Sequence, residues 1–232
     1  MKILLYGKNS KNIAELVKNS GFEVVSFKPD LIISFGGDGT LLASEREYPG
    51  IPKLPIRNSQ FCHKCVNHDD KVVLEKILNG KLKLQEYKKL QTTFLYKDFY
   101  PLNDFVIRNL SPVHTIRFRI NGGKLFIGDG VVVSTPFGSS GYFKSITRQT
   151  FKTGYGIAFN NTTEEVSPLF LKDKDLVNFN LVRGKATLSY DNSPEIFTID
   201  EGSEIQFKLS DQVAKIYGDT SLRCPNCKVI RD

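Results

Sequence analysis

The chain has 232 residues, of which 40% are hydrophobic and 25% are charged. These proportions are those of a globular protein and exclude a wholly disordered chain, while the length allows one large domain or two small ones. The longest apolar run, Leu31–Phe35, is far too short to span a bilayer. The first ten residues contain no long apolar segment, so we expect no signal peptide and a soluble, cytoplasmic protein.

The net charge of +7 is compatible with a nucleic acid, a membrane surface or a polyanionic small substrate as partner. The cations are spread along the chain rather than gathered in one arm, which argues against nucleic acid. Within residues 81–89, lysines alternate with apolar residues as on a half-exposed strand, and we interpret them as a solvated face, with a phosphate-steering surface as the alternative. These lysines are Lys81, Lys83, Lys88 and Lys89.

The first eighty residues alternate between strand and helix patterns. We expect strands at residues 3–6, 22–27 and 31–35, followed by a short extended piece at 51–56. Helices are expected after Ser10, from Thr40 onward, and from Asp70 to the glycine at position 80. Strands that alternate with helices predict a small, mostly parallel α/β sheet, which we assign to a domain at residues 1–80.

From residue 81 onward the pattern is almost purely that of strands separated by turn residues. We therefore expect a β-rich second domain at residues 81–217, followed by a tail at 218–232. The expected strands are residues 90–96, 104–107, 115–120, 124–127, 131–133, 176–182, 186–190, 195–199 and 204–209.

The segment Gly36–Gly37–Asp38–Gly39–Thr40 stands between an expected strand and an expected helix. Glycines allow backbone N–H groups to approach a phosphate closely, and the start of a helix favours negative charge. An aspartate here repels phosphate, so it makes sense as a base for an attacking hydroxyl or as a ligand of a metal that bridges phosphates. The alternative is an ordinary Asp–Gly turn.

A second cluster covers residues 128–142, where a strand runs into a loop of hydroxyls and glycines that ends at Tyr142. Such a loop can bind ribose and phosphate while the tyrosine stacks on a ring, although similar loops are common on protein surfaces. The pair Asn103–Asp104, ahead of a strand, is a weak indication when taken alone.

Together and in this order, these motifs resemble the NAD kinase family. The resemblance is carried by PDLIISFGGDGTLL, LNDFVI, DGVVVSTPFGSSGY and the late β segment LSYDNSPEIFTIDEGSEIQF. It implies a two-domain fold and transfer of a phosphoryl group, from ATP with magnesium (Mg²⁺) or from polyphosphate, to the 2′-hydroxyl of the adenosine ribose of NAD. It also implies a homo-oligomer, a dimer or tetramer, and a tail that packs back onto the first domain.

The resemblance also implies roles for the residues around Asp38. Asp38 matches the family's catalytic aspartate, which activates the 2′-hydroxyl. Gly36, Gly37 and Gly39 match the glycines that let phosphates approach, and Thr40 matches the residue that follows them.

Other positions match residues of the family that bind the nucleotide. Asn103 matches the asparagine, and Asp104 the usual glutamate, of a pair that hydrogen-bonds the dinucleotide. Asp129 matches an aspartate near the nicotinamide end. The further matches are Ser140, Gly141, Tyr142, Ser145 and Asp191.

The sequence departs from the family at several of these positions. Phe137 stands where threonine is usual, and Asp104 is shorter than glutamate by one methylene. The glycine pair expected after Ser145 is replaced by residues 146–149, and the Gly-Ile-Asn expected after the third strand by residues 55–58. We expect a divergent but active kinase.

Two other classes share part of this pattern. Diacylglycerol and sphingosine kinases also carry GGDGT but lack the loop that ends at Tyr142, so a kinase of a lipid or another small alcohol is the main alternative. A dinucleotide-binding protein that has lost catalysis is another, and a zinc-containing nucleic-acid binder is a third.

All four cysteines occur in two Cys-x-x-Cys pairs. Two such pairs can provide the four thiolates of a tetrahedral structural zinc (Zn²⁺) site, here Cys62, Cys65, Cys224 and Cys227. A redox-active dithiol, a disulfide or two unrelated pairs are the alternatives, and His63 could replace one cysteine as a ligand. We interpret His68 and His114 as surface or capping residues.

Overall fold

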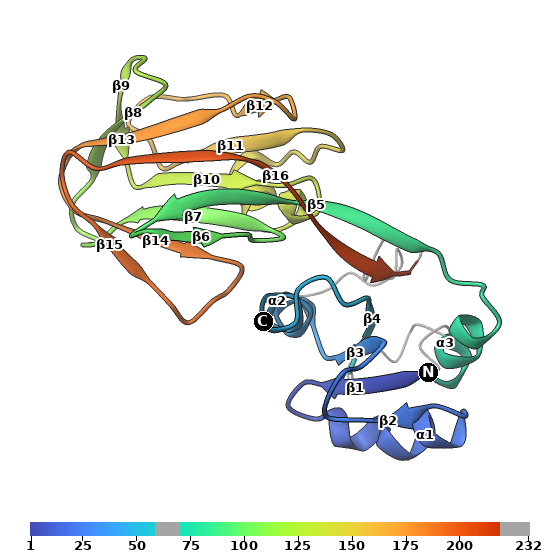
Figure 1. Cartoon of the computed structure of the whole chain (residues 1–232). Helices are drawn as coiled ribbons and strands as arrows, with labels where there is room; N and C mark the ends of the chain where they lie inside the picture. The colour runs from blue at the N-terminus through green and yellow to red at the C-terminus, as the bar shows by residue number, and fades with distance from the viewer. Residues whose placement is uncertain (59–69, 219–232) are drawn as a thin grey trace. The chain divides into compact units, whose positions relative to one another are not determined.

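The computed structural model of the chain describes residues 1–58 and 70–218 (Figure 1). The backbone divides into two compact units. The first holds Met1–Tyr87 and the described residues from Ala214 on, and the second holds Lys88–Val213. Two long strands, β5 (Leu84–Phe94) and β16 (Glu204–Tyr217), each have residues in both units.

The first unit is a parallel sheet with the strand order β2-β1-β3-β4-β16. Its strands are β1 (Lys2–Tyr6), β2 (Glu23–Val24), β3 (Leu31–Phe35) and β4 (Lys53–Ile56), together with the end of β16. Its helices are the 3-10 helix η1 (Ser10–Ile13) and the α-helices α1 (Ala14–Asn19), α2 (Asp38–Glu47) and α3 (Asp70–Leu78). This arrangement confirms the α/β fold predicted for the amino-terminal part.

The chain leaves β1 and β3 toward opposite edges of this sheet. It passes from β1 through η1 and α1 to β2 at the edge, whereas it passes from β3 through α2 to β4 in the other direction. The strand order therefore reverses between β1 and β3. In open α/β sheets, ligands bind outside the carboxyl ends of the strands at such a switch point.

Burial explains why these residues form the centre of the unit. All five residues of β3 are buried, as expected for a strand that is covered on both faces. A buried ion pair fastens α2 to the neighbouring strand, because Lys53 Nζ in β4 lies 2.5 Å from Glu45 Oε2 in α2. The same ammonium donates to the carbonyl oxygens of Tyr48 and Ile51.

The second unit contains an antiparallel sheet with the order β12-β11-β10-β7-β14-β15 (Figure 1). Its strands are β7 (Asp104–Asn109), β10 (Gly130–Ser134), β11 (Tyr155–Asn160), β12 (Leu169–Leu171), β14 (Ala186–Tyr190) and β15 (Phe197–Ile199). Between β10 and β11 lie the 3-10 helix η2 (Gly138–Ser140) and the helix α4 (Tyr142–Thr147).

Further strands pack against this sheet through an aromatic core. β8 (Ile116–Ile120), β9 (Leu125–Gly128) and β13 (Val177–Arg183) pair with one another and with β16, while β6 (Lys97–Phe99) pairs with β5. Phe105 of β7 and Phe207 of β16 are fully buried, with ring centroids 5.2 Å apart, so the core joins strands of both groups. The predicted β-rich second part is confirmed.

Several elements differ from the sequence prediction. The strand expected at residues 22–27 is only Glu23–Val24, whereas β16 continues to Tyr217. Helix α2 begins at Asp38, two residues before its expected start, so Asp38 belongs to the first helical turn. The buried strand β11 was missed because its sequence, YGIAFN, lacks clear alternation, and Gly156 within it is required by the rings of Phe143 and Phe151.

The lysines near residue 88 do not form one solvated face. Lys88 is exposed and its ammonium lies 2.6 Å from Asp173 Oδ2, but Lys89 is only 3% exposed. The expectation is therefore wrong for Lys89, whose positive charge acts on the buried carboxylate of Asp191. Among the helices of the described residues, none has the length and apolar character to cross a membrane.

Candidate active site

The glycine-rich segment after β3 forms a compact turn at the carboxyl edge of the first sheet. The N–H of Gly36 donates to the carbonyl of Ile56, and Gly37 then caps α2 with an extended backbone. A Cβ on Gly36 would lie 2.2 Å from Thr40 Oγ1, so the turn packs directly on the threonine of its own motif. No atom of the residues that the structure describes would lie within 4 Å of a Cβ on Gly37, so these residues leave this side of the turn open to a ligand.

The loop after β1 lies against the same turn. Gly7 has a φ of +130°, and a Cβ there would lie 2.3 Å from the carbonyl oxygen of Phe35. Only glycine allows this close approach. The ends of β1 and β3 therefore meet at the switch point of the sheet, next to the glycine-rich turn.

Asp38 is the first residue of α2 and is partly buried. The first backbone bond of the helix runs from Thr40 N to Gly37 O at 3.0 Å, so the N–H groups of Asp38 and Gly39 precede the regular helical ladder. N–H groups in this position attract anions, and the helix dipole acts in the same direction. A carboxylate at this point can also accept a proton from a hydroxyl beside the bound anion.

In the second unit, β7 begins at the end of the antiparallel sheet where β10 and β14 finish. Ser134, the last residue of β10, pairs with Asp104, the first residue of β7, and Tyr190, the last residue of β14, pairs with Phe105. The structure thus brings together the segment before β7, the loop after β10 and Asp191 after β14. These segments contain most of the residues that the sequence selected for nucleotide binding.

The loop after β10 is locked onto the backbone of Asn103. The carbonyl oxygen of Asn103 accepts from Thr135 N at 2.9 Å and from Ser134 Oγ at 3.3 Å. Thr135 Oγ1 donates to Leu102 O at 2.6 Å and accepts from Gly138 N at 3.0 Å. The roles of Thr135 and Leu102 are not visible in the sequence, because they depend on a contact between segments about 30 residues apart.

The rest of this loop provides polar groups at its surface. Ser140 and Tyr142 are partly buried, and Ser145 is exposed with its hydroxyl donating to the carbonyl of Tyr142 at 2.7 Å. Gly141 links η2 to α4, which ends at Arg148 with a left-handed φ of +62°. Glycine is preferred where a helix ends in this left-handed conformation, and here arginine adopts it.

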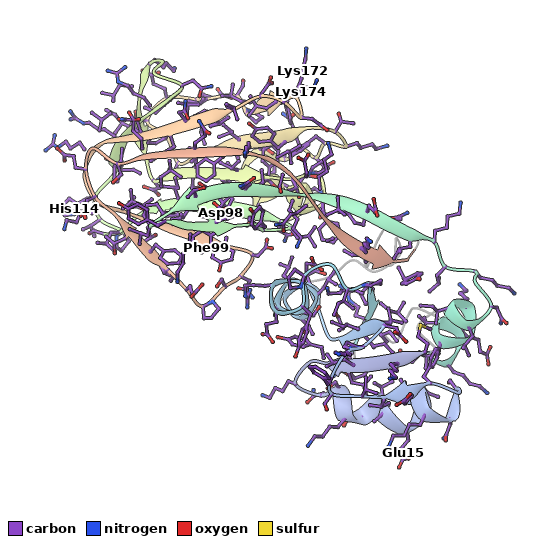
Figure 2. The ribbon with its side chains drawn as sticks, viewed as in Figure 1. Glu15, Asp98, Phe99, His114, Lys172 and Lys174 are labelled. Carbon is purple, nitrogen blue, oxygen red and sulfur yellow. The ribbon has the colours of Figure 1, made fainter. Side chains whose placement is uncertain are left out.

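Basic side chains gather near this end of the sheet. β11 begins opposite the end of β12, since Tyr155 pairs with Leu171, and the loops that flank this pair carry exposed lysines and an arginine. Figure 2 labels two of them, Lys172 and Lys174. The exposed basic residues of these loops and of α4 are Lys144, Arg148, Lys152, Lys172 and Lys174, and the last two alternate with Asp173 and Asp175.

Asp129 lies at the opposite end of β10 from this cluster. Five Cα-to-Cα steps of extended chain separate it from Ser134, a distance of about 17 Å. Its carboxylate accepts from Asn161 Nδ2 at 3.0 Å and from Asn109 Nδ2 at 3.4 Å. Asn109 also donates to the carbonyl of His114, which Figure 2 labels at this end of the unit. The structure therefore does not bring Asp129 together with Asn103.

Two carboxyl groups next to Asn103, those of Asp104 and Asp191, are buried. Burial raises the pKa of Asp104 to about 7, and the negative charge of Asp191 contributes to this increase. Burial also raises the pKa of Asp191 to about 6, although three backbone N–H groups and the charge of Lys89 oppose the shift. Because three backbone N–H groups donate to the Asp191 carboxylate, the pKa of Asp104 is raised further than that of Asp191, and Asp104 keeps its proton to the higher pH.

The four cysteines and His63 lie outside the described residues, as does His68. Across residues 1–58 and 70–218, no group of three or more His, Cys, Asp or Glu side chains is arranged to hold a metal ion.

Substitution of Gly138 tests the lock between the two loops. A Cβ at this position would lie 2.3 Å from the carbonyl oxygen and 2.6 Å from the Cα of Asn103, and backbone atoms cannot rotate away. We expect Gly138→Ala to lower the free energy of unfolding by about 1 to 3 kcal/mol, measured by urea denaturation. Gly37→Ala, whose Cβ has open space, should cost less than about 1 kcal/mol, and equal losses for the two variants would contradict this packing.

The buried carboxyl pair predicts a dependence of stability on pH. Folded Asp104 keeps its proton above the ordinary pKa of 3.8, so its contribution to stability is complete at low pH and is lost as pH rises through about 7. Between pH 5 and 7, Tm of the wild type should fall by up to about 3 to 6 °C per pH unit more than Tm of Asp104→Asn. Parallel curves of Tm against pH for the two proteins would refute the assignment.

Comparison with known proteins gives a consistent family. No family model matches the chain. The chain is 30% identical over 229 residues to an NAD kinase of Aquifex aeolicus, a match that covers 90% of this chain and 80% of that protein. It is 34% identical over 151 residues to NAD kinase 2 of Listeria monocytogenes, which covers 59% of this chain and 56% of the relative.

Solved structures agree in fold. An NAD kinase from Archaeoglobus fulgidus, crystallised in complex with ATP, has a TM-score of 0.75 at 19% identity and covers 94% of both chains. Yeast NADH kinase complexed with NADH has a TM-score of 0.78 at 14% identity and covers 94% of this chain and 83% of its own. Because the Aquifex relative reaches 30% identity over most of both proteins, the chain belongs to the NAD kinase family.

Proposed function

We propose that this protein is an NAD kinase that transfers a phosphoryl group from ATP to the 2′-hydroxyl of the adenosine ribose of NAD. The observation that carries the proposal is the position of Asp38, in the first turn of a helix at the switch point of a parallel sheet. Relatives named NAD kinase support the choice of this alcohol over a lipid.

Asp38 is proposed as the base that takes the proton of the 2′-hydroxyl. The open side of Gly37 and the first N–H groups of α2 provide a place for phosphate oxygens beside the carboxylate. Phosphoryl transfer needs mainly positioning and charge neutralisation, so a base in this location adds to binding that the backbone already supplies. Gly36, Gly39 and Thr40 shape this turn.

Magnesium fits the chemistry of this turn. Mg²⁺ is bound through substrate phosphates and one or two carboxylates, and Asp38 is the carboxylate present here. When bound with ATP, the ion would neutralise charge on the phosphates. ATP is the proposed donor, with polyphosphate as the alternative.

The second unit is proposed to bind the dinucleotide through the loops at the end of β7 and β10. Asn103 offers a carboxamide that has no hydrogen-bond partner within residues 1–58 and 70–218, and Tyr142 offers a ring that can stack on a base. Asp104, while protonated, can donate a hydrogen bond as well as accept one. The exposed cations near α4 suit an anionic substrate. Ser140, Gly141 and Ser145 are proposed as further contacts, and the role of Asp129 at the nicotinamide end stays a prediction.

The Asp38 proposal predicts a specific loss of turnover. Asp38→Asn removes the base but keeps the shape, so kcat for NADP formation from NAD, ATP and magnesium should fall by about 10²- to 10⁴-fold. NAD affinity, measured by calorimetry, should change little. Glu47→Gln is the control, because it removes an exposed carboxylate from the other end of the same helix. A variant that retains turnover within a few-fold of wild type would exclude Asp38 as the base, and a wild type that phosphorylates lipid but not NAD would overturn the proposed substrate.

We also propose a structural zinc held by Cys62, Cys65, Cys224 and Cys227. Two Cys-x-x-Cys pairs match the ligand set of a closed tetrahedral site. Protein purified without added metal should contain about one zinc per chain, and a chelator or Cys224→Ser should lower Tm while turnover by the protein that remains folded is unchanged. Zinc-free protein with four titratable thiols and an unchanged Tm would disprove the site. A dimer or tetramer and a tail at 218–232 that packs on the first domain remain predictions from the family resemblance. A cytoplasmic location remains a prediction from the sequence alone.

A further inference from the structure

Asp191 is buried, and its side chain bonds to the backbone of residues 102–104 rather than facing solvent. Its side chain accepts from Leu102 N at 2.5 Å, from Asn103 N at 2.6 Å and more weakly from Asp104 N at 3.4 Å. The residue is only 4% exposed, and its own N–H donates to the carbonyl of Asp104 at 3.3 Å. A single aspartate thus fixes three successive residues that are nearly 90 positions away in the sequence.

A buried countercharge accompanies this carboxylate. Lys89 of β5 is 3% exposed, and its charge lowers the pKa of Asp191 against the effect of burial. Burying two charges is costly, and such a pair often contributes little to net stability. Its presence next to a binding loop is better explained by the geometry that it imposes on that loop.

The backbone of Asn103 is constrained from every side by these contacts. Its N–H donates to Asp191, its carbonyl accepts from Thr135 and Ser134, and its Cα is covered by Gly138. Within the described parts of the chain, these contacts occupy the N–H and the carbonyl of Asn103 and leave its side chain to reach a ligand. A carboxamide held on a fixed backbone loses little entropy when it binds, which is the physical advantage of a preorganised site.

We propose that Asp191 is a positioning residue that acts on NAD through Asn103 rather than by touching the substrate. This proposal rests on the proposed function. Asp191→Asn replaces one acceptor oxygen with an NH₂ group that faces backbone donors, so the segment at residues 102–104 must shift. The NAD hydrogen bond of Asn103 is then lost even though Asn103 itself is present.

The test is a double-mutant cycle on the full-length protein. Asn103→Ala should raise KM for NAD roughly 5- to 100-fold, because one polar partner is lost in a closed site. Asp191→Asn should raise it by a similar factor and leave KM for ATP unchanged, and the double variant should be no worse than the poorer single variant. Asp200→Asn is the matched control, because it neutralises an exposed aspartate after β15 and should leave both constants unchanged.

Two outcomes would overturn the proposal. Multiplying effects in the double variant would mean that Asp191 acts independently of Asn103. A wild-type KM for NAD in Asp191→Asn, whatever its kcat, would exclude a role of Asp191 in positioning Asn103 for NAD. If Asp191→Asn does not fold, Asp191→Glu, whose longer side chain displaces the carboxylate from the same backbone donors, replaces it in the same cycle with the same criteria. A wild type that makes no NADP would instead refute the proposed function, so the two failures are distinguishable.

Discussion

The candidate site of the second unit depends on the hydrogen bonds that the Asp191 carboxylate accepts from the backbone of residues 102–104. The carboxylate ties the end of β14 to the segment before β7, and the loop after β10 is in turn fastened to that segment through Thr135 and Gly138. Three loops from distant parts of the sequence therefore share one rigid framework. Without this carboxylate, three backbone donors would lose their acceptor in a buried location, where an unpaired polar group costs about 1 to 3 kcal/mol.

The first unit uses a related device. Helix α2 begins with Asp38 and is fastened near its other end by the buried pair of Glu45 and Lys53. In the first unit Lys53 forms a buried ion pair with Glu45 in the helix that carries Asp38, and in the second unit the charge of the buried Lys89 acts on the Asp191 carboxylate. Both arrangements remove charges from water, so we attribute them to the placement of backbone segments rather than to net stability. Rigid placement is what phosphoryl transfer requires, since its rate depends mainly on positioning.

The sequence predicted the two kinds of fold and most of the residues that the structure gathers near Asn103. Local patterns sufficed for these, because the buried run of β3, the glycines after it and the loop that ends at Tyr142 are each contiguous. Long-range contacts were not predictable. Lys89 resembled a surface lysine because nothing nearby indicates that Asp191 lies beside it, and the distance of Asp129 from Asn103 follows only from strand register.

The central claim is that NAD binds the framework built on Asp191. Hydrogen exchange followed with and without saturating NAD measures this directly, because bound ligand slows amide exchange where it stabilises the backbone. We predict slower exchange in two separate peptides, one that covers residues 101–106 and one that covers residues 135–146, with little change in α1 at Ala14–Asn19. Unchanged exchange in both peptides at a saturating NAD concentration would contradict the account.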